Sequence, residues 1–135
     1  PDAGSVQSPA RIGAVLQTPS LVDGLTTFEN VSLAAGRGVT DAQVADALAH
    51  LLPAGALEKT PTELSGGMKR LAEIARAMLS DGEAIVLDEP FAGLDEESHA
   101  RVCAFILDNL HGRPLVVATH DPVDAELLDA RIARL

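Results

Sequence analysis

Two short apolar runs with a helical pattern between them constrain the fold of this chain more than any other feature. Residues 84–87 and residues 115–118 are aliphatic and of strand length. Asp95 stands between them at an N-cap position, and apolar side chains follow it at helical spacing, at Val102, Phe105, Ile106 and Leu110. A strand, a helix and a strand in this order form a crossover that is parallel and right-handed. The sequence therefore predicts an α/β fold with a mainly parallel sheet.

A third apolar run, residues 12–16, is predicted to add a buried strand to the same sheet. Each of the three runs is followed by polar side chains, which are Gln17, the adjacent Asp88 and Glu89, and His120. Ligands bind beyond the carboxyl ends of parallel strands, because the helices that follow begin there. We therefore expect these four side chains to converge on one edge of the sheet.

Residues 18–63 show helical periodicity instead. Thr26 with Glu29, and Thr40 with Gln43, have the spacing of capping boxes, and each pair is followed by apolar residues at helical spacing. This section predicts a small helical lobe that carries no chemistry of its own.

Shorter signals complete the framework. Ser65 is placed to cap a helix over residues 66–78, and Asp121 before Pro122 predicts the start of a last helix. Short strands are predicted around residues 5–6 and at residues 132–135.

The composition excludes one class of partner. Ten Lys and Arg residues face twenty Asp and Glu residues, and the formal net charge of -10 opposes general binding to nucleic acid or to anionic lipid. A phosphate group must therefore be held locally, by backbone N–H groups or by a metal ion.

No run approaches the roughly 18 apolar residues of a membrane-spanning helix. With three Phe and no Tyr or Trp the core must be aliphatic, and the single Cys103 is predicted to pack within it.

Two groups of residues have the chemistry of a phosphate site. An Asp such as Asp88 suits Mg²⁺, Glu89 could orient or deprotonate a water, and His120 could contact a terminal phosphate. Each has a plainer interpretation, as solvated acids at a strand end and as a His that bonds to a neighbouring strand. Ser65, Gly66 and Gly67 begin a helix whose N–H groups and dipole favour an anion, although a surface turn would have the same sequence.

Taken together, the motifs resemble the ATP-binding subunit of an ABC transporter. Residues 64–68, LSGGM, are similar to the family's LSGGQ signature, and residues 84–90, AIVLDEP, to its Walker B strand. Residues 93–97, GLDEE, resemble the D-loop, residues 118–121, ATHD, the switch-histidine loop, and residues 13–17, GAVLQ, the Q-loop. The resemblance covers nearly the whole chain. It implies a partial P-loop NTPase (RecA-like) core with a small α-helical subdomain.

The resemblance also implies a division of the chain and a role for each motif residue. Residues 1–17 and 81–135 would form the core lobe, and residues 18–80 the helical subdomain with the signature motif. Asp88 and Gln17 would bind Mg²⁺, Glu89 would polarise the attacking water, and His120 would contact the γ-phosphate. An ATP held mainly by a second subunit would be bound by the signature residues, which are Leu64, Ser65, Gly66, Gly67 and Met68. Asp95 of the D-loop would contribute to this site from the dimer interface. Met68 replaces the family's usual Gln, a change for which we expect a modest effect.

The family's phosphate cradle is missing from the sequence. A P-loop needs Gly-Lys-Ser or Gly-Lys-Thr, yet none of the eleven glycines is followed by Lys, and the lysines are Lys59 and Lys69. Residues 1–6 resemble the stretch that follows the P-loop helix in the family. We therefore expect the chain to be a fragment that begins just beyond that helix, and to be inactive alone.

The implied function is hydrolysis of MgATP in a head-to-tail dimer, at the cytoplasmic face of a membrane, to drive solute transport through permease subunits. The short helical lobe favours an importer-type subunit. One alternative is a non-catalytic module that lends Ser65 and Gly67 to a complete ATPase. Another is an ABC ATPase of DNA repair or translation. The acidic charge and the compact interval between Gln17 and Leu64 both count against this alternative.

Overall fold

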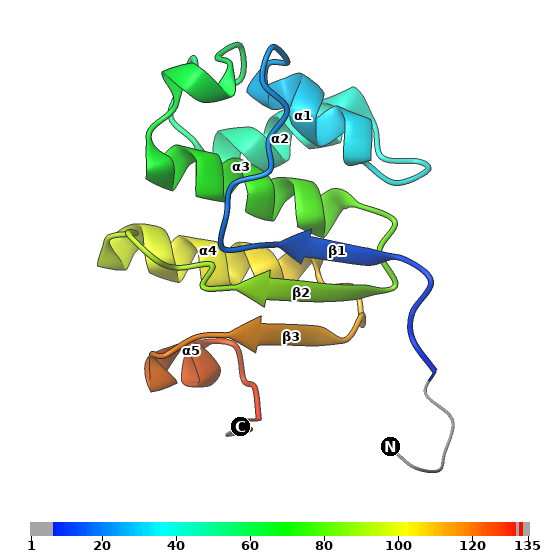
Figure 1. Cartoon of the computed structure of the whole chain (residues 1–135), viewed down its shortest axis with the longest axis vertical. Helices are drawn as coiled ribbons and strands as arrows, with labels where there is room; N and C mark the ends of the chain where they lie inside the picture. Colours follow the sequence, from blue (N-terminus) through cyan, green and yellow to red (C-terminus); the bar gives the residue numbers. More distant parts are fainter. Residues whose placement is uncertain (1–6, 132, 134–135) are drawn as a thin grey trace.

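The computed structural model describes residues 7–131 and 133, and its centre is a three-stranded parallel sheet (Figure 1). The strands lie in the order β1-β2-β3, with bounds β1 Ile12–Val15, β2 Ala84–Asp88 and β3 Leu115–Ala118. Both neighbouring pairs are parallel. The predicted α/β class and parallel crossover are therefore confirmed. The strands predicted at residues 5–6 and 132–135 involve residues outside the described part of the chain.

Strand β1 is shorter than predicted. It ends at Val15, and the side chain of Leu16 is 53% exposed. The chain leaves the sheet here because the carbonyl of Leu16 accepts a hydrogen bond from the guanidinium of Arg70, 2.5 Å away, instead of continuing the ladder. The apolar run in the sequence therefore extends one residue beyond the strand itself.

The helices follow the predicted capping signals. Their bounds are α1 Thr27–Ala34, α2 Asp41–Leu51, α3 Gly66–Leu79, α4 Glu96–Asn109 and α5 Pro122–Leu127. Both predicted capping boxes are present, with the Oγ1 of Thr26 accepting from the N–H of Glu29 and that of Thr40 from the N–H of Gln43. A further capping box begins the 3-10 helix η1, Pro61–Glu63, which the periodicity did not predict because a single turn has no repeat.

Helix α3 lies at the centre of the packing. It contacts α1 and α2 on one side and β1 and α4 on the other, an arrangement visible in Figure 1. Its buried side chains are Leu71, Ala72, Glu73, Ile74, Ala75, Ala77 and Met78. The core around it is mainly aliphatic, as predicted, and includes Phe91 and Phe105. Cys103 is buried as predicted, and desolvation raises the pKa of its thiol to about 11. The proposed boundary between a core lobe and a helical subdomain stays a prediction, since α3 packs on both.

The sheet is buried on one face only, whereas the apolar runs predicted buried strands. Ile85, Leu87 and Val15 point into the core, and the alternate positions carry apolar side chains outward. On that outer face Ile12 is 48% exposed and Val116 59% exposed. Parallel sheets usually have both faces covered, so the run of aliphatic residues in each strand reflects two apolar faces.

Replacement of Ile74 by Ala tests the importance of α3 in the core. Ile74 is fully buried, so the variant loses both apolar burial and packing, and we expect its free energy of unfolding to fall by about 2–5 kcal/mol. Leu33, which is 74% exposed on α1, provides the control, and its replacement by Ala should cost no more than about 0.5 kcal/mol. Urea unfolding followed by circular dichroism measures both. Equal losses in the two variants would contradict this assignment of the core.

Candidate nucleotide site

Strands β2 and β3 end at the same level and bring their following residues together. Asp88, the last residue of β2, is paired with Ala118, the last residue of β3. The N–H of Glu89 then donates a hydrogen bond of 2.8 Å to the carbonyl of Ala118. Glu89 has a φ of 47°, in the left-handed region that a residue with a Cβ rarely adopts. The backbone at this point is therefore held in an unfavourable conformation by the neighbouring strand, a feature that often marks functional positions.

The side chains of Glu89 and His120 form a pair at this edge. The Nδ1 atom of His120 lies 3.0 Å from Oε1 and 3.1 Å from Oε2 of Glu89. The hydrogen bond and the negative charge of Glu89 hold the pKa of His120 above its ordinary value. His120 is 85% exposed, and Glu89 is 28% exposed. The pair can therefore exchange partners with a ligand at the edge of the sheet.

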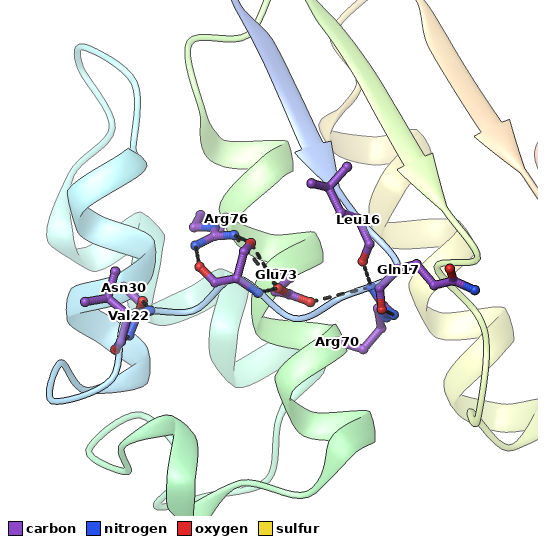
Figure 2. A network of polar contacts seen from close by, with 8 residues as sticks. Leu16, Gln17, Val22, Asn30, Arg70, Glu73 and Arg76 are labelled. Atoms are coloured by element: carbon purple, nitrogen blue, oxygen red, sulfur yellow. Dashed lines mark hydrogen bonds and ion pairs between the residues drawn. The ribbon is translucent and has the colours of Figure 1, made fainter.

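Gln17 and Asp88 lie at the exits of neighbouring strands, β1 and β2. The carbonyl of Gln17 accepts a hydrogen bond of 3.1 Å from Arg70, and Figure 2 shows its side chain directed away from Glu73. The described residues contain no group of three or more His, Cys, Asp or Glu side chains that could hold a metal ion. A carboxylate and an amide oxygen do suit Mg²⁺, which commonly takes one or two protein ligands and completes its shell with water and phosphate oxygens. The chemistry of Asp88 and Gln17 therefore fits a shared Mg²⁺ site but not a closed protein cage.

The turn before α3 presents free backbone N–H groups. The Oγ of Ser65 caps the helix by accepting from the N–H of Met68 at 3.2 Å, which leaves the N–H groups of Gly66 and Gly67 without an intrahelical acceptor. A Cβ on Gly66 would meet no atom within 4 Å, and one on Gly67 only a methyl carbon of Leu94 at 3.9 Å. A ligand can therefore approach this backbone closely, at the positive end of the helix dipole.

A cleft of about 400 Å³ joins this turn to the loop before α4. Ser65, Gly67 and Met68 line one side, and Asp95 lines the other, whereas Leu64 is buried and outside the lining. Hydrogen bonds from Ser98, the strongest from its backbone N–H, lower the pKa of Asp95 below its ordinary value. The residues predicted to bind nucleotide thus form two groups, one at the carboxyl edge of the sheet and one in this cleft. Their roles stay predictions.

A larger cleft, of about 480 Å³, contains none of the predicted residues. It runs between α2 and α4, and its polar lining includes His50, Asp81 and Arg113. Of these two clefts the smaller is the candidate for nucleotide binding, because it contains the N-terminus of α3 with its free N–H groups.

The structure also reveals a polar contact that sequence reasoning missed. Thr119, next to His120, donates a short hydrogen bond to the buried carboxylate of Asp124. The Nε2 atom of His99 lies 2.8 Å from the same carboxylate, and its ring lies tilted against that of Phe91, with 4.4 Å between the ring centroids. The sequence assigned no role to His99, because a lone His on a helix gives no signal. These contacts hold the loop that carries His120 against α4.

Three charged residues of α3 were missed for a related reason. Arg70, Glu73 and Arg76 are three residues apart, a spacing that is typical of a solvated helix face. Glu73 stands between the apolar Ala72 and Ile74, but adjacent residues do not share a helix face, so this position carries no signal of burial. The three side chains contact the segment that follows β1.

The comparison with known families agrees with this geometry. A family model described as ABC transporter matches residues 2–92, which include both strand ends at Gln17 and Asp88 and the turn at Ser65. The chain belongs to the ABC transporter family.

Curated relatives in this ABC transporter family include importers and an exporter. The aliphatic sulfonates import ATP-binding protein SsuB 2 of Burkholderia cenocepacia is 35% identical over 138 residues, which cover 99% of this chain and 51% of that protein. The macrolide export ATP-binding/permease protein MacB of Campylobacter jejuni is 38% identical over 118 residues, which cover 83% of this chain and 18% of the length of MacB. The chain therefore spans about half the length of the sulfonate-import relatives that it matches.

Solved structures of ABC transporter cassettes have the same fold. The ATP-binding cassette MJ0796, in a dimeric post-hydrolysis state bound to ADP and Pi, superposes with a TM-score of 0.74 at 28% identity. The alignment covers 87% of this chain and 55% of that one. The P-loop NTPase-like α/β fold expected from the motifs is thus shown by a likeness that covers 87% of this chain.

Titration of His120 tests the pair at the edge of this ABC transporter domain. Because the raised pKa comes from Glu89, we expect the NMR resonances of the His120 ring to titrate above pH 6.5 and to return to the ordinary range in Glu89→Gln. A group whose pKa rises on folding stabilises the fold at low pH and loses that contribution as the pH passes its folded pKa. Asp88→Asn is the control, and it should leave the pKa of His120 raised. A pKa of His120 at its ordinary value in the unaltered chain would contradict the pairing.

Proposed function

We propose that this chain is part of the ATP-hydrolysing subunit of an importer-type ABC transporter. The observation that carries the proposal is the contact of 3.0 Å between Glu89 and His120, beside Asp88 at the carboxyl edge of the sheet. A phosphate site needs a group that activates water, a group that responds to the terminal phosphate and a carboxylate for the metal. These three residues have the chemistry for those tasks.

Glu89 acts on the attacking water in this proposal. Its carboxylate is already hydrogen-bonded to His120, so the imidazole orients it while leaving it 28% exposed for a water molecule. A terminal phosphate, being an anion, would compete with Glu89 for the protonated form of His120. His120 would then move from the carboxylate to the phosphate, and the carboxylate would be free to accept a proton from water.

Asp88 and Gln17 hold Mg²⁺ in this proposal, together with phosphate oxygens and water. When bound, the ion neutralises the negative charge that develops on the phosphates. Gln17 reports the state of this site to the rest of the chain, because its backbone is tied to Arg70 of α3.

The cleft at Ser65 binds a second nucleotide, which a partner subunit holds. The free N–H groups of Gly66 and Gly67 and the hydroxyl of Ser65 attract the terminal phosphate, and Asp95 on the opposite wall contacts the partner. Two subunits arranged head to tail would thus complete each other's sites. The dimeric state of the related cassette MJ0796 supports this arrangement.

The relatives favour import over export. The sulfonate importer aligns over nearly all of this chain, whereas the macrolide exporter, in which ATP-binding and permease functions share one chain, aligns over less of it. We therefore propose a separate subunit that docks on permease subunits at the cytoplasmic face of the membrane. Within the described residues no helix has both the length and the apolar character to cross a bilayer.

One alternative keeps the cleft and removes the catalysis. In this alternative the chain is the partner that supplies Ser65 and Gly67 to a complete ATPase, which provides the Gly-Lys-Ser or Gly-Lys-Thr motif. The upstream coding sequence distinguishes the two proposals. An in-frame GxxxxGK[ST] motif supports the catalytic subunit, and a start codon near Pro1 supports the non-catalytic module.

ATP hydrolysis tests the proposed role of Glu89. In the complete subunit, Glu89→Gln should lower kcat by about 100-fold or more, because a positioned general base contributes at least this factor. Glu58→Gln, an exposed residue of a loop, should keep full activity. The 135 residues alone should show no detectable turnover. Robust hydrolysis by the isolated chain that Glu89→Gln abolishes would overturn the proposed need for a P-loop.

ATP-dependent dimerisation tests the proposed role of the cleft. Gly67→Asp places a carboxylate at the second residue of α3, where it favours the helix but repels the phosphate of a nucleotide. We expect this variant to stay monomeric with MgATP in sedimentation experiments on the complete subunit. Ala42→Asp makes the same change at the second residue of α2, away from the cleft, and should dimerise normally. Normal dimerisation of Gly67→Asp would count against the cleft as a nucleotide site.

A further inference from the structure

A buried carboxylate lies in the middle of helix α3, facing the segment that follows β1 (Figure 2). The side chain of Glu73 has 0% exposure, and burying a charge is costly unless it is paired and hydrogen-bonded. Two guanidinium groups flank it, with Arg70 at 3.5 Å and Arg76 at 3.9 Å. Neither distance is that of a strong ion pair. The arrangement therefore needs an explanation other than mutual attraction of the charges.

The explanation lies in what the three side chains hold. Oε1 of Glu73 accepts hydrogen bonds from the N–H of Ser20 at 2.5 Å and from its hydroxyl at 3.2 Å. Arg76 donates to the carbonyl of Ser20 at 2.9 Å and to its hydroxyl at 2.6 Å. Every polar group of Ser20 is thus bonded to α3. Oε2 of Glu73 accepts no hydrogen bond from the described residues, so the hydrogen bonds of the carboxylate go to Ser20 while the two arginines compensate its charge.

Arg70 holds the same segment closer to the sheet. Its guanidinium donates to the carbonyls of Leu16 at 2.5 Å and Gln17 at 3.1 Å. These bonds replace the ladder that β1 would have continued. Residues 16–20 are exposed and have no regular secondary structure, yet the carbonyls of Leu16 and Gln17 and both backbone groups of Ser20 bond to side chains of α3.

The segment is also tied at its far end. The amide of Asn30 on α1 accepts from the N–H of Val22 at 2.7 Å and donates to its carbonyl at 3.1 Å. Since α1 packs on α3, the whole connection from β1 to α1 is held to one group of helices. The connection therefore follows α3 when that helix moves.

We propose that Glu73 is a positioning residue that, with Arg70 and Arg76, clamps residues 16–20 to α3, so that Gln17 and the Ser65 turn move as one body. The proposal deepens the proposed function and rests on it for the roles of Gln17 and Ser65. Ser65 caps the same helix that carries Glu73. A change at the Mg²⁺ site of one subunit would thus displace the turn that contacts the nucleotide of the other.

The clamp can be tested without nucleotide, by hydrogen exchange. In Glu73→Gln the amide of Ser20 loses its bond to a charged acceptor, and we expect its NMR-detected exchange to speed up by about tenfold or more. Amides of α2, such as that of Leu48, should exchange as before. Ile74→Val, a core variant, should raise exchange evenly through global unfolding instead. Glu58→Gln should leave both amides unchanged.

A second variant covers the case in which Glu73→Gln does not fold. Arg76→Met removes two bonds to Ser20 but leaves Arg70 to compensate the buried charge. Faster exchange confined to Ser20 and its neighbours, in either variant, supports the clamp. Unchanged exchange of Ser20 in a folded variant, or an even rise across the chain, overturns it.

Kinetics on the complete subunit tests the consequence for the site. We expect Glu73→Gln to lower kcat and to raise, by several-fold, the Mg²⁺ concentration needed for half-maximal ATPase activity, because Gln17 is no longer held. A residue that only stabilises the fold would reduce activity with the folded fraction and leave the Mg²⁺ dependence unchanged. That result would overturn the positioning role. Absence of ATPase activity in the unaltered subunit would instead overturn the proposed function, and hydrogen exchange would still decide the clamp.

Discussion

The packing of helix α3 is the constraint on which the rest of this structure depends. One side of the helix contacts the sheet at β1, and the other side contacts α1 and α2. Its N-terminus forms the turn at Ser65, and its middle holds the segment after β1 through Glu73. A single rigid helix therefore links the exit of the sheet, the helical lobe and one wall of the cleft.

The buried carboxylate of Glu73 has a physical purpose in holding an exposed connection. Residues 16–20 belong to neither a strand nor a helix, and several of their backbone groups bond to side chains of α3 instead. An apolar residue in place of Glu73 would pack well but would remove the acceptor that fixes the N–H of Ser20. The cost of burying a carboxylate is thus offset by the definite position that it imposes on the loop, a use of buried charge that differs from simple stabilisation.

The order of the parallel strands brings together the candidate site residues at the carboxyl edge of the sheet. Because β2 pairs with both β1 and β3, Gln17, Asp88 and Glu89 emerge beside one another, and His120 reaches Glu89 across the gap. The loop that carries His120 is fixed by Asp124 and His99. The arrangement of this edge therefore depends on contacts from α4 and α5 as well as on the strands.

Much of the framework could be predicted from local chemistry. The apolar runs located all three strands, and the caps at Thr26, Thr40, Ser65 and Asp95 located the helix starts, because capping depends on residues within one turn. Strand β1 was predicted one residue too long, since the bond from Arg70 that ends it comes from 54 positions away. The one-sided burial of the sheet was missed because an apolar residue has the same sequence signal whether or not a neighbour covers it.

The sequence by itself determined the α/β class, the approximate positions of the strands and the family, because these depend on residue type and on spacing along the chain. Only the tertiary structure decided that Glu89 adopts a left-handed conformation and pairs with His120. It also decided that Glu73 is a buried ligand of Ser20 and not a surface charge. The reason is the same in each case: these properties belong to pairs of residues that folding brings together, 31 and 53 positions apart, and no local pattern records them.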